Sequence, residues 1–115
     1  MLPDDRDLAF LWDMLESGSS AVEFISNATV YKYLKSKLLR SGVERQLEIF
    51  GEAAKKVSTE FKHKHPEIPW RDIIDQRNAI IHEYGEIRSE LIWRMAKIRL
   101  PQILEALKPL IPNNE

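Results

Sequence analysis

Apolar residues recur at every third or fourth position over most of this chain, which is the spacing of amphipathic helices. The clearest stretch predicts one helix that ends in the polar segment 62–66, and its apolar positions are Leu39, Val43, Leu47, Phe50, Ala54, Val57 and Phe61. The alternating pattern typical of strands does not occur. The pattern therefore predicts an all-α fold.

Signals for helix ends divide the first third of the chain. Asp4 or Asp5 is placed to cap a first helix that reaches Ile25. Within this helix, Gly18-Ser19-Ser20 are weak helix formers, so one kinked helix and two short helices are both open. A short helix is expected to start near Thr29.

The second half of the chain predicts two more helices. Pro69 suits the first turn of a helix that runs to Tyr84, and Gly85 is placed to cap its C-terminus. A last helix is expected over residues 87–110, and Pro101 should kink or split it. With short connections throughout, we expect a single domain, residues 1–115, folded as an up-and-down bundle of four to five helices.

Composition restricts the function further. The 17 basic and 18 acidic residues nearly balance, so a surface that binds nucleic acid would have to be local or assembled between subunits. The absence of cysteine excludes disulfides and thiolate metal sites. The N-terminus lacks the pattern of a signal peptide, and no apolar run reaches membrane-spanning length. These features predict a cytoplasmic protein with no membrane partner.

The segment from Arg77 to Tyr84 carries the candidate chemistry, with the pattern R-N-x-x-x-H-x-Y. On a helical wheel, Arg77 and Tyr84 fall in the middle of an apolar stripe, and Asn78 and His82 lie on its flank. A guanidinium in such a stripe needs a carboxylate, a phosphate or a wet cleft.

Two interpretations of this segment follow from the residues alone. In the first, His82 transfers protons, Arg77 binds a phosphate with two parallel hydrogen bonds, and Asn78 orients the histidine or donates to the phosphate, as a metal-independent ribonuclease requires. In the second, Arg77 forms an internal ion pair with Glu52 of the neighbouring helix, and Tyr84 is a core residue with its hydroxyl at the surface. Spacing alone leaves both interpretations of Arg77 open, whereas for Tyr84 it favours the core position over exposure at the rim of a cleft.

Other polar residues give weaker signals. His63 and His65 lack further ligands nearby in the sequence, so a solvated loop is favoured over a metal site. Two groups of basic residues are interpreted mainly as solvated helix faces, although either group could border an RNA groove: Lys32, Lys35, Lys37 and Arg40, and Lys55, Lys56, Lys62 and Lys64.

Three sequence blocks, in order and spacing, resemble the HepT-like toxins of the HEPN superfamily. They are VERQLEIFGEAA at 43–54, HPEIPWRDII at 65–74, and RNAIIHEY at 77–84. The resemblance covers nearly the whole chain, with the first helix similar only in general character. It implies a HEPN-like helical bundle that forms a homodimer, in which the motifs of two subunits face each other across the two-fold axis.

The resemblance also implies roles for the motif residues. Arg77 and His82 would be the catalytic pair of an endoribonuclease toxin with an RNA substrate. From the residues themselves we add Asn78 as a positioning residue and Glu52 as a supporting residue beside Arg77. Tyr84 would receive AMP from an MNT-type nucleotidyltransferase antitoxin, as in a type VII-like toxin–antitoxin pair. No metal and no cofactor are expected.

Two alternatives lack catalysis. A helical binding module would dock the nucleotidyltransferase or a nucleotide, with Arg77 only holding phosphate. A purely structural arrangement would seal the pair of Arg77 and Glu52 away from solvent.

Overall fold

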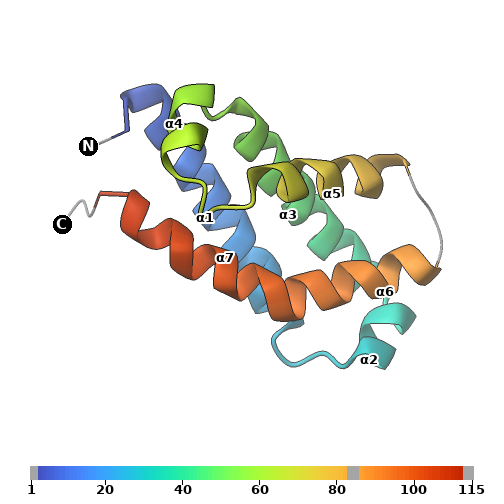
Figure 1. Ribbon diagram of the computed structural model, residues 1–115. Helices are drawn as coiled ribbons and strands as arrows, with labels where there is room; N and C mark the ends of the chain where they lie inside the picture. The colour runs from blue at the N-terminus through green and yellow to red at the C-terminus, as the bar shows by residue number, and fades with distance from the viewer. Residues whose placement is uncertain (1–2, 83–85, 113–115) are drawn as a thin grey trace.

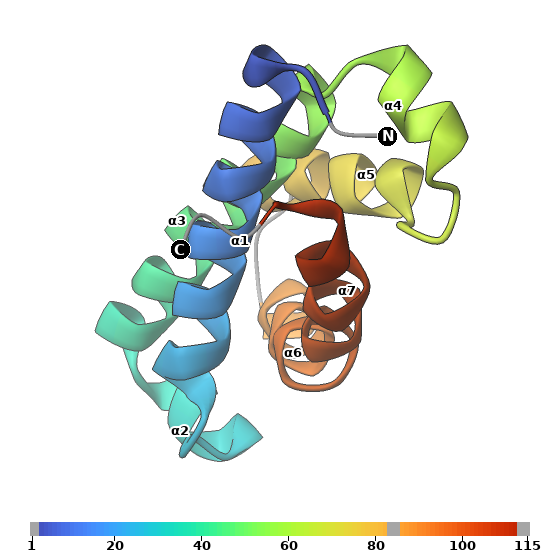
Figure 2. The ribbon, with the colours of Figure 1, turned by 90° about the vertical axis from the view of Figure 1, so that its left-hand side faces the viewer.

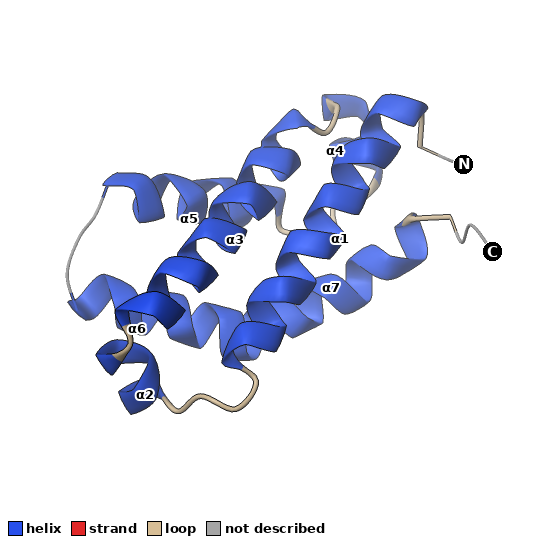
Figure 3. Cartoon of the chain, turned by 180° about the vertical axis from the view of Figure 1, so that it is seen from behind, coloured by secondary structure: helices blue, strands red, loops and turns tan. Residues whose placement is uncertain are grey.

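Two long helices, α1 (Asp5–Ile25) and α3 (Lys37–Lys56), lie side by side and form the largest contact in the protein (Figures 1 and 3). The computed structural model describes residues 3–82 and 86–112, and the side chains of residues 82–87 also fall outside this description. The carboxylate of Asp4 accepts a hydrogen bond of 2.8 Å from the amide of Asp7, which confirms Asp4 as the N-cap.

The first helix is a single continuous helix, because its weak central segment is held by packing. A side-chain carbon added at Gly18 would lie 2.8 Å from Leu104 Cδ2 and 3.1 Å from Phe50 Cε1. Glycine therefore allows two other helices to approach α1 closely at this point, and their contact stabilises a helical stretch that its sequence alone favours weakly.

The prediction of one long helix over residues 39–61 is wrong toward its C-terminal end, because the structure has two helices in this range. α3 ends at Lys56, and α4 (Thr59–Lys64) follows after a break at Val57 and Ser58. Ser58 caps α4 through a hydrogen bond to the amide of Phe61, and the buried Asp7 carboxylate accepts from both the Ser58 amide (2.8 Å) and hydroxyl (2.6 Å). This contact between segments 51 residues apart places the break.

The segment predicted as a polar connection is therefore largely helical. His63 lies exposed on α4. His65 follows α4 directly, with its ring centroid 4.4 Å from that of Phe61 and its Nδ1 3.2 Å from Glu67. His65 is thus explained by packing and a carboxylate neighbour.

The remaining helices complete the bundle. The short α2 (Val30–Lys35) starts near Thr29, as expected, with Thr29 as its N-cap, and α5 (Trp70–His82) begins directly after Pro69. The predicted extension of α5 to Tyr84 and the Gly85 cap lie outside the described residues. The last run consists of α6 (Glu86–Arg94), a π-helical turn η1 (Met95–Arg99), α7 (Leu100–Leu107) and a final turn η2 (Lys108–Leu110).

The predicted interruption by Pro101 is confirmed. Proline cannot donate the hydrogen bond that a regular helix needs at this position, and the π-helical turn lies directly before α7. Figure 2 looks nearly along α6 and α7 and shows α7 beside α1.

One hydrophobic core joins these elements, and its largest fully buried side chains include Leu11 and Met14 of α1, Phe50 of α3 and Leu107 of α7. Every element in the described ranges is a helix, so the predicted all-α bundle is confirmed. Its four long runs are α1, α3, α5 and the run from α6 to α7, while α2 and α4 are short additions. None of the described helices is both long and apolar enough to cross a membrane.

Candidate functional site

Arg77 lies on the side of α5 that packs against α3, at a point where only glycine fits opposite. A side-chain carbon added at Gly51 would lie 2.3 Å from Cβ of Arg77 and 2.9 Å from its Cγ. Any larger residue at position 51 would force the two helices apart, since the clash involves the base of the side chain and not its flexible end. Gly51 thus fixes where the guanidinium emerges.

The guanidinium makes two hydrogen bonds to neighbouring residues. Arg77 Nη2 donates to Glu52 Oε2 at 2.9 Å, and Nη1 donates to Asn78 Oδ1 at 3.0 Å. The side chain of Arg77 is 21% exposed and that of Glu52 is 49% exposed. The ion pair expected from the sequence therefore exists, but it faces solvent and is not the sealed pair that a purely structural role requires.

The pair borders a small groove of about 210 Å³ between α1, α3 and α5. Three cations line this groove, Arg45, Lys56 and Arg77, and so do three carboxylates, Asp13, Glu48 and Glu52. The charges balance, so an incoming phosphate competes with carboxylates for the arginine. Arg77 Nε is buried without a hydrogen-bond partner among the described residues, so the two bonds above do not exhaust its donors.

The structure brings together three of the predicted site residues: Arg77, Asn78 and Glu52. Asn78 accepts a hydrogen bond from the arginine through its Oδ1, a contact that the sequence did not predict. His82 is the last residue of α5, but its side chain lies outside the described residues, and so does the whole of Tyr84.

A second arginine, which sequence reasoning missed, holds the last turns of α5. Arg88 of α6 donates from Nη1 to the carbonyl of Ile80 at 2.7 Å and from Nη2 to Glu44 Oε2 of α3 at 3.0 Å. Both side chains are largely buried, at 15% and 18% exposure. A cation at the carbonyl end of a helix is favourable, because the last carbonyls have no partner within the helix.

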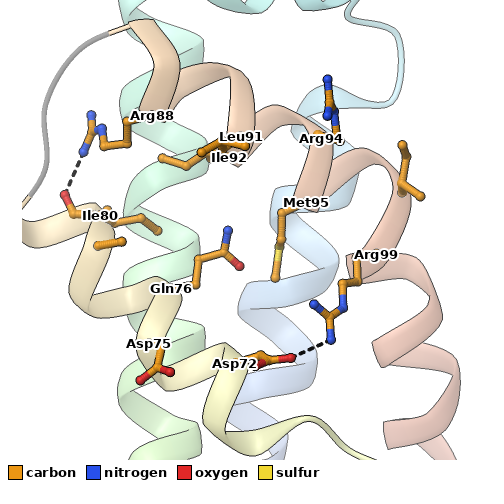
Figure 4. A pocket seen from close by; sticks show the side chains of 12 residues that line it. Asp72, Asp75, Gln76, Ile80, Arg88, Leu91, Ile92, Arg94, Met95 and Arg99 are labelled. Carbon is orange, nitrogen blue, oxygen red and sulfur yellow. Dashed lines mark hydrogen bonds and ion pairs between the residues drawn. The ribbon is translucent and has the colours of Figure 1, made fainter.

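Arg88 also marks one end of a larger groove between α5 and α6, of about 600 Å³ (Figure 4). The other end is bounded by an ion pair of 2.8 Å between Arg99 and Asp72. Leu91 and Ile98 line this groove while 57% and 56% exposed, which is unusual for large apolar side chains. The groove therefore offers an apolar surface on a different side of α5 from the one that carries Arg77.

Known proteins are similar to this chain over most of its length. The family model described as "Ribonuclease HepT-like" matches residues 14–110. "Putative RNase MJ1380" from Methanocaldococcus jannaschii is 37% identical over 99 residues, which cover 85% of this chain and 91% of that protein. "Probable ribonuclease HepT" from Thermococcus cleftensis is 36% identical over 95 residues, which cover 79% of this chain and 86% of that protein. No solved structure gives a significant match.

Proposed function

The chain belongs to the HepT-like ribonuclease family, and we propose that it is a metal-independent endoribonuclease, the toxin of a type VII-like toxin–antitoxin pair. The observation that carries the proposal is the partly exposed side chain of Arg77, held by Glu52 and Asn78 on the helix that ends at His82. A guanidinium fixed at the edge of a groove is suited to a phosphate that gains charge during reaction.

The proposed reaction is an internal transfer within the RNA. A base removes the proton of a ribose 2′-hydroxyl, the 2′-oxygen attacks the adjacent phosphorus, and the bond from phosphorus to the 5′-oxygen breaks as an acid protonates that oxygen. Arg77 stabilises the crowded phosphorane, while Asn78 and Glu52 hold the arginine in position. The products are a 2′,3′-cyclic phosphate and a 5′-hydroxyl.

The proposed active form is a homodimer, because one histidine cannot act as base and acid in the same encounter. A two-fold axis supplies a second His82. The groove between α5 and α6 supports such an interface: it exposes Leu91 and Ile98, and it carries acidic Asp75 on one wall and basic Arg94 on the other. A surface with both signs of charge can match its own copy across a two-fold axis.

The first test uses single-stranded RNA in the presence of EDTA. We expect the purified protein to cut it and to leave 2′,3′-cyclic phosphate ends, because the residues above supply the charge and protons that a metal would otherwise provide. An RNA of the same sequence with 2′-O-methyl groups is the control and should remain intact, since it lacks the attacking hydroxyl. Gel electrophoresis and mass spectrometry of the fragments give the result.

The second candidate function is a binding module without catalysis, and the balanced charge of the groove at Arg77 favours it. Such a module would bind a nucleotidyltransferase or a nucleotide and leave both RNAs intact. Tight binding without any cleavage, with or without EDTA, would therefore decide for the module.

We further propose that a nucleotidyltransferase antitoxin silences the toxin by attaching AMP to Tyr84. The added phosphodiester brings negative charge and bulk near Arg77 and His82 in the sequence, so it would compete with RNA for the arginine. Co-expression with the nucleotidyltransferase should raise the intact mass by whole adenylyl groups and abolish cleavage. Tyr84→Phe is the matched control and should gain no mass and keep its activity; silencing of this variant would contradict the proposal.

A further inference from the structure

The exposed side of α2 combines aromatic rings and lysines in a way that the site around Arg77 does not explain. We define the α2 patch as Phe24, Tyr31, Lys32, Lys35 and Lys37. Tyr31 is 67% exposed and Phe24 is 42% exposed, and all three lysines are exposed. By contrast Tyr33, two residues along the same helix, is completely buried, so α2 turns one tyrosine into the core and the other toward solvent.

The patch lies in a stretch without acidic residues, in a chain whose total charge is nearly balanced. From Phe24 to Val43 the sequence has four basic residues and no acidic one. Among the described residues no carboxylate pairs with Lys32, Lys35 or Lys37, whereas Lys56, Lys64 and Lys108 each lie within 4.0 Å of a glutamate. The three lysines of the patch therefore keep their full attraction for an external anion.

The rings of the patch border a hollow of about 500 Å³ between the end of α1 and α2. Phe24 lies over Gly42 of α3, where an added side-chain carbon would be 3.4 Å from its ring. Lys35 Nζ lies 5.5 Å from the centroid of the Tyr31 ring. Glu23 is the one acidic residue that lines the hollow. Flat rings beside cations that lack a carboxylate partner are the combination that binds single-stranded nucleic acid, since bases stack on the rings and phosphates meet the lysines.

We propose that the α2 patch is an anchoring subsite for single-stranded RNA, separate from the catalytic groove. The inference rests on the proposed ribonuclease function and names where its substrate is held. α2 contacts both α3 and α6, and Trp93 Nε1 of α6 donates to the carbonyl of Ala28 at 3.2 Å. α2, which carries Tyr31, Lys32 and Lys35 of the patch, lies at the end of the bundle where α5 ends and α6 begins (Figures 1 and 3), so the proposed strand would run from the patch toward α5.

The test compares patch variants for RNA binding and cleavage separately. Binding is measured by fluorescence anisotropy with a labelled oligouridylate of about 12 nucleotides, over a series of salt concentrations. Tyr31→Ala should weaken binding at least five-fold, while Tyr31→Phe keeps the ring and should stay within two-fold of the wild type. Lys32→Gln/Lys35→Gln should lower the slope of log K against log salt by about 1.4, which corresponds to two lost phosphate contacts.

The matched control for charge is Lys64→Gln/Lys108→Gln, which removes two lysines that already have glutamate partners. It should leave the salt slope unchanged. Four results would each overturn the subsite. The first is an equal loss of salt slope in the control, and the second is unchanged RNA binding by Tyr31→Ala. The others are equally tight binding of an RNA duplex and no RNA binding by the wild-type protein. Wild-type protein that binds through the patch but never cuts RNA would overturn the ribonuclease proposal alone. Cleavage with a KM that does not respond to Tyr31→Ala would overturn the patch alone.

Discussion

Arg77→Ala and His82→Ala should each remove RNA cleavage while the protein stays folded. The loss of a charged donor aimed at a transition state costs roughly 10²–10³-fold in rate. The loss of a proton-transfer group costs roughly 10²–10⁴-fold. Cleavage rates on labelled RNA and the helical signal in circular dichroism measure the two effects separately. Arg77→Lys should also be strongly impaired, because an ammonium cannot form the two parallel bonds of a guanidinium.

The controls come from the same molecule. Arg71 lies on the same helix as Arg77, with a side chain that is 91% exposed, so Arg71→Ala repeats the change in charge away from the groove. His63 lies exposed on α4, and His63→Ala repeats the loss of an imidazole. Both variants should cut RNA at the wild-type rate. Full activity of His82→Ala would contradict the proposed mechanism outright.

A mixing experiment extends this prediction to the dimer. If each active site needs the histidines of two subunits, a mixed dimer of wild-type and His82→Ala chains is inactive. After subunit exchange at equal amounts, about a quarter of the dimers are fully wild-type. The mixture should therefore have about a quarter of the activity of wild-type protein at the same total concentration. A chain that works alone would instead keep about half.

The sequence predicted those parts of the fold that depend on residues close together along the chain. The Asp4 cap and the interruption of the α-helix near Pro101 follow from the chemistry of single residues, and both are confirmed. The break between α3 and α4 could not be predicted in the same way. It depends on Asp7, a residue that reads as an ordinary first-turn acid until the fold brings it to Ser58.

The same distinction applies to the candidate site. The pair of Arg77 and Glu52 was predictable, because a guanidinium in an apolar stripe demands an acceptor on the adjacent helix. The bond between Arg88 and Glu44 was not, since the two residues are 44 positions apart and each resembles a solvated helix residue. The lysines around α2 were interpreted mainly as a solvated face. The exposure of Tyr31 beside them and the lack of carboxylate partners among the described residues separate this group from other surface lysines, and both became visible only in the fold.

Arg88→Ala should cause the largest loss of stability among single changes at charged residues outside the motif. The substitution removes the partner of a largely buried carboxylate, Glu44, and of the Ile80 carbonyl. Breaking such a pair on one side costs about 3 kcal/mol in the free energy of unfolding. In a chain of this size the melting temperature should fall by on the order of 10 °C.

Arg99→Ala is the matched control, because Arg99 lies in the run from α6 to α7 and also binds α5, through Asp72 at 2.8 Å. Those two side chains are 52% and 59% exposed, so water replaces the lost partner and the cost should stay below about 1 kcal/mol. Equal effects of the two variants on chemical denaturation would show that the contact of Arg88 is no stronger than an exposed ion pair.

The cause of the loss can be separated by also removing the carboxylate. Tyr33 is buried in the same region, and burial, followed by the nearby charge of Glu44, raises the pKa of its phenol well above the usual value, while Arg88 and Arg40 oppose this. An unpaired Glu44 would therefore lie in a poorly solvated setting, and its charge is what makes Arg88→Ala costly. Adding Glu44→Leu to Arg88→Ala removes that charge and should recover most of the lost stability, although the Ile80 carbonyl still lacks its donor. A double variant as unstable as the single one would place the cost in the last turn of α5 and not in the buried charge.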